Sequence, residues 1–136
     1  MDRVAGMSCL NDRNIVVVVD DDPGMLMGLQ RLLWQHAFKP ILYSSAHDFK
    51  THRDFEGVSC VIFDINLGDG SGLELAHGLR AAGQCVPIIC MTGDTDPAVR
   101  KAALDTGCIA FLTKPFPAQS LLEPLKRASA QRVRPA

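Results

Sequence analysis

The chain has 136 residues, of which 21% are charged, and a formal net charge of −1 at pH 7. This length suits one domain with a single core, and the balanced charge disfavours a free-standing nucleic-acid binder, which usually carries a basic excess. No stretch approaches the roughly 20 apolar residues of a membrane span, and residues 1–14 lack the apolar core of a signal peptide, so we expect a flexible tail there and no membrane contact.

The first part of the chain alternates apolar runs with helical patterns. Ile15–Val19 is a continuous β-branched run, typical of a strand buried on both faces of a parallel sheet. Asp22 stands before a proline in the pattern of a helix N-cap, which predicts a helix over Pro23–His36. We expect a second strand over Lys39–Tyr43 and a short helix over Ala46–Arg53.

The rest of the chain repeats this alternation. Short apolar runs predict strands over Cys60–Phe63, Ile88–Met91 and Ile109–Leu112. Helical patterns follow over Gly72–Ala82, from Pro97 to near Gly107, and after Pro117. We therefore expect the α/β class, with a doubly wound, five-stranded parallel sheet of flavodoxin-like type and strand order 2-1-3-4-5. The domain is placed at residues 15–128, with a short C-terminal tail over residues 129–136.

The five cysteines favour a reducing compartment, because their number is odd and several fall within predicted strands. They are Cys9, Cys60, Cys85, Cys90 and Cys108. No two have CxxC spacing, and the histidines lack the spacing of a zinc site. We interpret the thiols as small apolar core side chains and expect a cytoplasmic protein.

Polar residues follow four of the predicted strands. They are Asp20, Asp21, Asp64, Thr92 and Lys114. The functional crevice of an open parallel sheet lies beyond the carboxyl ends of its strands, so we expect these side chains at one edge. Two carboxylates ~4 Å apart repel by about 4 kcal/mol at an effective dielectric near 20, so the acidic cluster needs a cation, and Mg²⁺ is the hard divalent ion that suits it.

This set of side chains suits phosphoryl transfer. A carboxylate can attack phosphorus to give an acyl phosphate, provided that the developing charge is neutralised. Such transfer depends largely on positioning and electrostatics, so a metal, a lysine and a hydroxyl around an aspartate suffice. The competing interpretation, in which the aspartates only cap a helix and populate a loop, explains Asp22 but not Asp64.

Four segments of the chain resemble motifs of the response-regulator receiver domain of two-component signalling. They are VVDDDP at Val18–Pro23, FDINLGDGSG at Phe63–Gly72, MTG at Met91–Gly93 and FLTKPF at Phe111–Phe116. Each motif alone is weak evidence, but the four in this order and at this spacing are specific. The resemblance covers about Ile15–Arg127.

The resemblance implies a role for each residue of the acidic cluster. Asp64 is expected to be the phosphoacceptor and also a metal ligand. Asp21 is expected to bind Mg²⁺ directly, and Asp20 through a water molecule. Asn66 is expected to contribute its backbone carbonyl to the metal.

The same resemblance implies roles for the remaining motif residues. Lys114 is expected to pair first with Asp64 and then with the phosphoryl group, and a cis peptide bond is expected before Pro115. Thr92 is expected to bond a phosphoryl oxygen through its hydroxyl and, with the aromatic Phe111, to switch the face made by the fourth helix, the fifth strand and the fifth helix.

The implied function is that of a phosphoacceptor in a two-component phosphorelay. The donor would be a phosphohistidine on a sensor histidine kinase or a histidine phosphotransfer protein. The output would pass to a downstream effector protein or a separate output domain, and a phosphorylation-dependent dimer is a further option. Such a domain is not otherwise an enzyme, because it catalyses only its own phosphorylation and dephosphorylation.

Two other functions stay open. A receiver-like interaction module would never be phosphorylated, although the intact set of Asp64, Thr92 and Lys114 argues against it. A phosphatase of the haloacid-dehalogenase type would need a second acid two residues after its aspartyl nucleophile, where this chain has Asn66.

Two residues depart from what we expect of the family. Gly68 stands where many receivers have a proline nearby, and we predict a softer loop with unchanged chemistry. Pro124 falls within the last predicted helix, where a proline removes a backbone hydrogen bond, so we expect either a kink or a late start of that helix.

Overall fold

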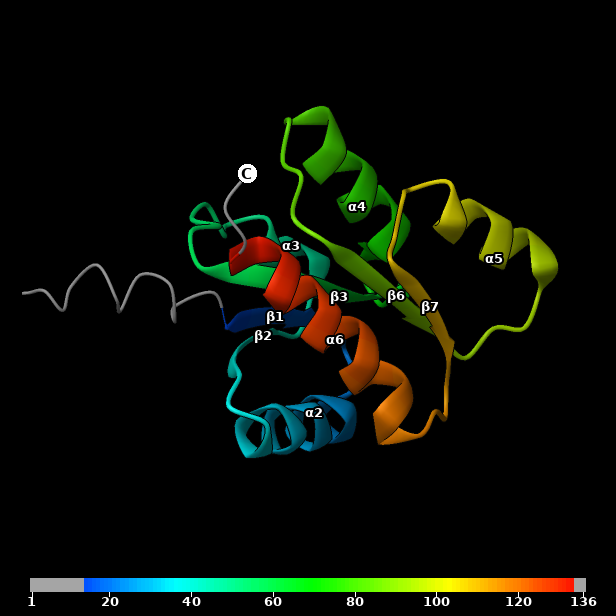
Figure 1. The fold of residues 1–136 in the computed structure, drawn as a ribbon. Helices are drawn as coiled ribbons and strands as arrows, with labels where there is room; N and C mark the ends of the chain where they lie inside the picture. The colour runs from blue at the N-terminus through cyan, green and yellow to red at the C-terminus, as the bar shows by residue number, and fades with distance from the viewer. Residues whose placement is uncertain (1–13, 134–136) are drawn as a thin grey trace, which may run out of the picture.

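A parallel sheet forms the centre of the computed structural model, which describes residues 14–133, with side chains described up to residue 130 (Figure 1). Its five strands are β1 (Ile15–Val19), β2 (Lys39–Tyr43), β3 (Val58–Asp64), β6 (Ile88–Thr92) and β7 (Ala110–Thr113). Their order is β2-β1-β3-β6-β7, and every neighbouring pair is parallel. The predicted fold class and strand order are therefore confirmed. Of the predicted N-terminal tail, residues 1–13 with Cys9 lie outside the described residues, whereas Asn14 is bonded to Ala37 and Lys39.

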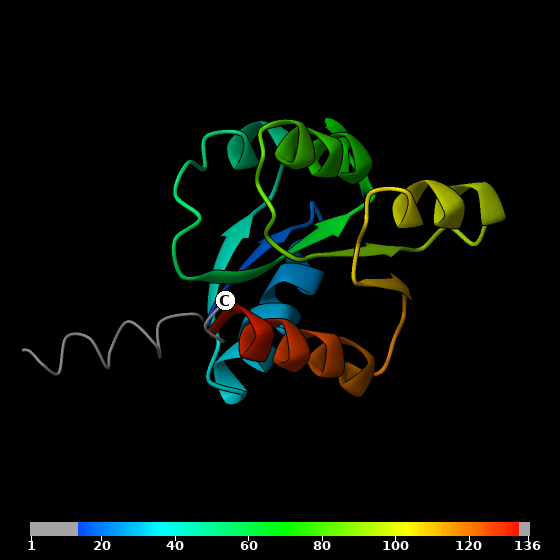
Figure 2. The same ribbon diagram turned by 45° about the horizontal axis from the view of Figure 1, so that its top comes forward.

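Helices cover both faces of the sheet (Figures 1 and 2). They are α2 (Pro23–Gln35), α3 (Ala46–Phe49), α4 (Gly72–Ala81), α5 (Pro97–Leu104) and α6 (Ala118–Val133). α2 and α6 lie on one face, and α3, α4 and α5 lie on the other (Figure 2). Asp22 and Asp96 cap α2 and α5 through their side chains, as Asp22 was expected to do from its place before a proline.

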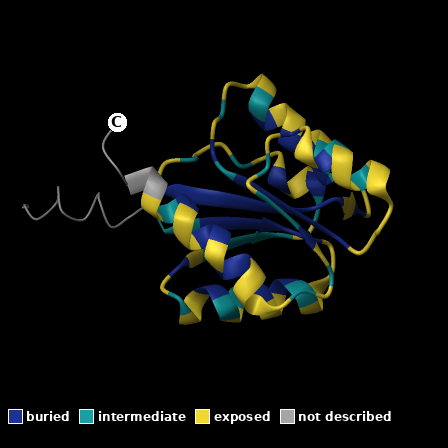
Figure 3. Ribbon diagram, turned by 45° about the vertical axis from the view of Figure 1, so that its right-hand side comes forward, coloured by how far each residue is buried: buried dark blue, intermediate teal, exposed yellow. Residues whose placement is uncertain are grey.

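The strands are buried on both faces, which is why their sequences read as continuous apolar runs. In β1, Val17 and Val19 pack under α3 and α4, whereas Val16 and Val18 pack under α2 and α6. All four side chains are fully buried, and each such burial contributes roughly 1.5–3 kcal/mol. Figure 3 shows the sheet as the buried centre, with exposed residues on the outer sides of the helices.

α3 is shorter than predicted, because it ends at Phe49 rather than at Arg53. The hydroxyl of Thr51 donates to the carbonyl of Asp48 at 2.6 Å, which closes a turn instead of continuing the helix. The His52 ring then stacks on Phe49, with 6.2 Å between the ring centroids. The chain after α3 is therefore held by this aromatic packing together with backbone hydrogen bonds from Thr51 to Asp48 and from His52 to Phe49.

α6 begins at Ala118 and continues through Pro124, so the late start that we considered for this helix is wrong. Leu121, Leu125 and Ala128 are buried on one face of α6, and this packing stabilises the helix on both sides of the proline. The helix reaches Val133, beyond the predicted end of the domain at residue 128.

The interpretation of the thiols as core side chains is confirmed for Cys60 and Cys90 and is wrong for Cys85. Cys85 is exposed because it lies in the loop between α4 and β6. Each helix within residues 14–133 is too short or too polar to cross a membrane.

Candidate functional site

The five polar residues predicted at the strand ends lie at one edge of the sheet. Asp64 is the last residue of β3 and pairs in register with Met91, one residue before Thr92 at the end of β6. Asp20 directly follows β1, and Lys114 directly follows β7. The parallel register thus brings residues that are far apart in the sequence to the same edge.

Lys114 joins two of the aspartates. Its Nζ lies 2.8 Å from Oδ2 of Asp20 and 2.9 Å from Oδ2 of Asp64. The Asp20 side chain is fully buried, that of Asp64 is 9% exposed and that of Lys114 is 22% exposed. Two carboxylates with little access to water therefore share one ammonium group, and the peptide bond from Lys114 to Pro115 is cis, as expected.

Burial and charge shift the titration of this cluster. Burial raises the pKa of the Asp20 carboxyl, and this effect outweighs the hydrogen bonds that Lys114 and the Asp22 backbone donate to it. Burial alone would lower the pKa of Lys114, but the bonds to Asp20 and Asp64 raise it above its usual value. Lys114 therefore stays charged, whereas burial of the Asp20 carboxylate beside it costs electrostatic free energy.

Asp21 completes a cluster of acids that could hold a metal ion. Unlike Asp20, Asp21 is exposed. Carboxylate oxygens of Asp20, Asp21 and Asp64 lie within 4.8 Å of one another. An all-oxygen set open to water on one side fits Mg²⁺, which usually keeps several water ligands and takes only one or two carboxylates.

Asn66 connects the acidic cluster to Thr92. Its backbone N–H donates to Oδ1 of Asp64 at 3.0 Å, and its Nδ2 lies 3.4 Å from Oγ1 of Thr92. Thr92 is fully buried, and its hydroxyl oxygen also accepts from the backbone N–H of Asp94 at 3.0 Å. The sequence indicated only the backbone carbonyl of Asn66, so this side-chain contact was missed.

The predicted softness of the loop after β3 stays a prediction, but the loop has an element that the sequence did not indicate. It contains a two-residue antiparallel pair, β4 (Asn66–Leu67) with β5 (Gly70–Ser71). The backbone of Gly68 is not in the left-handed region, but a Cβ there would lie 3.2 Å from Oδ2 of Asp21. The reason for glycine at this position is therefore its closeness to the acidic cluster.

Asp69 ties this loop to α3, a contact that the sequence did not indicate. Its two carboxylate oxygens accept from the backbone N–H groups of Ala46 and His47, at 2.8 and 2.9 Å. These bonds lower the pKa of Asp69. The partners are 22 and 23 positions away in the sequence, so no local pattern could have revealed the contact.

Phe111, the predicted switch aromatic, is half-buried in β7. The guanidinium carbon of Arg100 lies 5.5 Å from the centre of its ring, within the range of a cation–π contact. Both side chains line a pocket of about 200 Å³ together with Thr113. The ring is therefore covered by a charged side chain of α5, which the sequence analysis did not consider.

Residues 16–126 match the family described as the response regulator receiver domain. The chain is 29% identical over 124 residues to the response regulator protein TodT of Pseudomonas putida, covering 90% of this chain and 55% of TodT. It is 35% identical over 122 residues to the regulatory protein VirG of Agrobacterium fabrum, covering 89% of this chain and 47% of VirG. The chain thus spans about half the length of these curated relatives.

Among solved structures, a response regulator receiver protein from Pseudomonas putida superimposes with a TM-score of 0.76. The two chains are 26% identical, and the match covers 85% of this chain and 97% of the other. The similarity therefore extends over nearly the whole of a solved receiver protein.

Proposed function

The chain belongs to the receiver-domain family of two-component response regulators, and we propose that it accepts a phosphoryl group on Asp64 from a phosphohistidine of a sensor kinase or phosphotransfer protein. The observation that carries this proposal is the position of Lys114, which holds Asp20 and Asp64 together at 2.8 and 2.9 Å. A non-phosphorylated interaction module would have no need to bury two carboxylates around one ammonium group.

Asp64 is the nucleophile in this proposal. One of its carboxylate oxygens forms a bond to phosphorus, the bond from phosphorus to the donor imidazole nitrogen breaks, and the product is an acyl phosphate. The backbone N–H of Asn66 and the ammonium of Lys114 each hold one oxygen of Asp64, which fixes the orientation of the carboxylate. After transfer, Lys114 can follow the added negative charge onto a phosphoryl oxygen.

The acidic cluster also needs a metal ion to act on a phosphoryl group, because phosphate oxygens would be repelled by the carboxylates. We assign direct metal binding to Asp21, Asp64 and the backbone carbonyl of Asn66, and water-mediated binding to Asp20. Mg²⁺, when bound there, would neutralise charge on the phosphoryl oxygens. Lys114 supplies the complementary positive charge from the other side of Asp20 and Asp64.

The hydroxyl of Thr92 is the proposed sensor of phosphorylation. Its oxygen accepts from the backbone of Asp94 and contacts the Asn66 amide, and its proton is available to a phosphoryl oxygen. Movement of Thr92 toward the phosphoryl group would open space for the Phe111 ring and change the face of α5, β7 and α6. A downstream effector, an output domain or a second copy of the chain would bind this changed face.

The test is phosphorylation by acetyl phosphate with and without Mg²⁺, followed by mass spectrometry of the intact protein. One phosphoryl group is expected on the wild type with Mg²⁺, and none on Asp64→Asn or after chelation of the metal. Asp22→Asn is the matched control, because asparagine is an equally good N-cap and Asp22 lies outside the acidic cluster. A wild-type protein that stays unmodified would instead favour the non-phosphorylated interaction module.

A further inference from the structure

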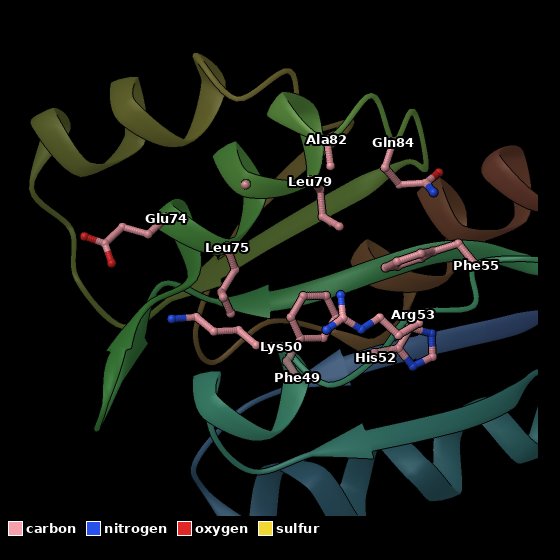
Figure 4. A pocket seen from close by; sticks show the side chains of 11 residues that line it. Phe49, Lys50, His52, Arg53, Phe55, Glu74, Leu75, Leu79, Ala82 and Gln84 are labelled. Atoms are coloured by element: carbon pink, nitrogen blue, oxygen red, sulfur yellow. The ribbon is translucent and has the colours of Figure 1, made fainter.

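A groove of about 470 Å³ lies between α3 with its following segment and α4, and none of its lining residues belongs to the acidic cluster (Figure 4). Phe49 in α3 and Phe55 in the segment after it contribute aromatic rings, and Leu75 and Leu79 contribute aliphatic side chains from α4. The volume falls in the range of roughly 300–1,000 Å³ that is typical of small-molecule sites.

The aromatic side of the groove is a packed cluster. The rings of Phe49 and Phe55 meet edge to face, with 6.5 Å between their centroids. His52 stacks on Phe49, and its Nδ1 lies 2.6 Å from the hydroxyl of Tyr43, which anchors the ring to β2. These contacts fix the apolar surface before any ligand arrives, so little conformational entropy would be lost on binding.

The charged lining residues favour an anion. Lys50 and Arg53 are exposed cations at the rim, and neither is paired with a carboxylate within the described residues. Glu74 is the acid among the lining residues, and it lies at the opposite end of the groove from Arg53 in Figure 4. The Lys50 ammonium points toward the Glu74 end of the groove in Figure 4, so the groove combines an apolar interior with one unpaired cation away from Glu74, which is Arg53.

From this arrangement we propose that the groove binds a small apolar carboxylate, a ligand with one ring or short hydrocarbon body and one carboxylate. The body would lie between Phe49 and Leu79, and the carboxylate would pair with Arg53. A protein partner is less well supported, because the large apolar side chains that are exposed within residues 14–130, such as Trp34 and Met27, all lie outside the groove. The proposal is independent of phosphorylation.

Gly78 offers a way to fill the groove without disturbing the fold. It lines the groove from α4, and a Cβ built on it would meet no atom within 4 Å. Gly28 in α2 is a matched position, since it is an exposed helix glycine with equally open surroundings that does not line the groove. Leucine is a good helix former, so Gly78→Leu and Gly28→Leu should both fold.

The test is a titration of the isotope-labelled chain with 3-phenylpropionate, followed by two-dimensional NMR of the backbone amides. Saturable shifts are expected for amides of α3, the segment after it and α4. The neutral 3-phenylpropionamide should bind about fivefold more weakly, as should 3-phenylpropionate to Arg53→Gln, because each change removes one ion pair worth about 1 kcal/mol. Gly78→Leu should abolish the shifts, and Gly28→Leu should retain them.

Four results would overturn the proposal. The first is the absence of saturable shifts in the groove. The second is equal binding of the amide and the carboxylate, which would remove the role of Arg53. The third is binding that survives in Gly78→Leu, once its spectrum and thermal unfolding show that the variant is folded. Binding of an acidic amphipathic peptide in place of 3-phenylpropionate would also overturn it, in favour of a protein partner.

Discussion

The acidic edge of the sheet and the groove between α3 and α4 are built by different means. At the edge, Asp20, Asp64 and Lys114 come from the ends of three strands, and the parallel register alone brings them within hydrogen-bonding distance. The groove instead depends on where α3 stops and on how the following aromatic residues pack. The position of a site made from strand ends can be predicted from the topology of the sheet. The position of a site made from packed loops depends on contacts that are seen only in the folded chain.

Helix α4 borders both the acidic edge and the groove, and two of its glycines show how tightly each region is packed. Gly72 begins α4 at the acidic edge, and a Cβ there would overlap the backbone carbonyl of Asp64. Gly78 faces open space in the groove. The edge therefore leaves no room for a methyl group, while the groove leaves room for a whole side chain.

Gly72→Ala is expected to have the largest effect on stability. The added methyl group must push the start of α4 away from Asp64 and Phe63, and such overpacking should lower the free energy of unfolding by about 3 kcal/mol. Chemical denaturation of the wild type and the variant would measure this loss. Gly78→Ala, in the same helix, is the control, and an equal loss in both variants would contradict the proposed difference between the two regions.

Lys114→Gln is expected to have the next largest effect, and it tests the charge balance of the edge. Removal of the ammonium leaves Asp20 and Asp64 close together without a cation, so the free energy of unfolding should fall by about 2 kcal/mol in a chelating buffer. Mg²⁺ should restore more stability to this variant than it adds to the wild type, since it would supply the missing positive charge. Thermal unfolding with and without Mg²⁺ would show whether the metal has this larger effect.

Lys101→Gln serves as the control for that experiment. Lys101 pairs with Asp105 at 3.4 Å on the exposed side of α5, and an exposed pair of this kind contributes about 0–1 kcal/mol. A Mg²⁺ response of the same size in both lysine variants would argue against metal binding at the acidic edge.

The sequence predicted the edge well because each of its residues is marked locally. Asp64 and Thr92 each end a continuous apolar run, and the order of strands and helices places such ends together. The roles of these residues rest on the resemblance and stay predictions, although their positions are confirmed. The strand order was predictable for the same reason, since right-handed crossovers leave few alternatives.

The sequence did not predict contacts that depend on tertiary packing. The early end of α3 was missed because no proline or glycine marks it between Ala46 and Arg53; in the structure the turn closed by Thr51 and the packing of His52 on Phe49 follow the helix. The position of Arg100 over Phe111 was missed for a similar reason, since it joins a helix and a strand. α6 continues through Pro124 because its buried leucines outweigh the local effect of the proline.

Gly78→Ala is expected to stabilise the chain. Alanine is favoured over glycine in a helix interior by roughly 1 kcal/mol, and the new methyl group meets no atom within 4 Å. The free energy of unfolding should therefore rise by about 1 kcal/mol in chemical denaturation. Gly28→Ala in α2 should give a gain of similar size, and a loss at position 78 alone would mean that the groove is narrower than the structure indicates.

Asp69→Asn is expected to have the smallest effect, and it tests a loop contact that connects the two regions. Asp69 lies in the loop after β3, yet its carboxylate caps the first turn of α3, which carries Phe49. Because these bonds lower the pKa of Asp69, the stability that they contribute is present above the unfolded value near 3.9 and is lost as the pH falls through the lower folded value.

The melting temperature of Asp69→Asn should therefore lie below that of the wild type at neutral pH, and the two should converge in acid. Asp54→Asn is the control, because this exposed aspartate accepts from the backbone N–H of Glu56 in its own loop, and an equal convergence in both variants would contradict the role of the α3 cap. If the groove depends on this cap, Asp69→Asn should also weaken the binding of 3-phenylpropionate, and unchanged binding would show that the groove and the acidic edge are independent.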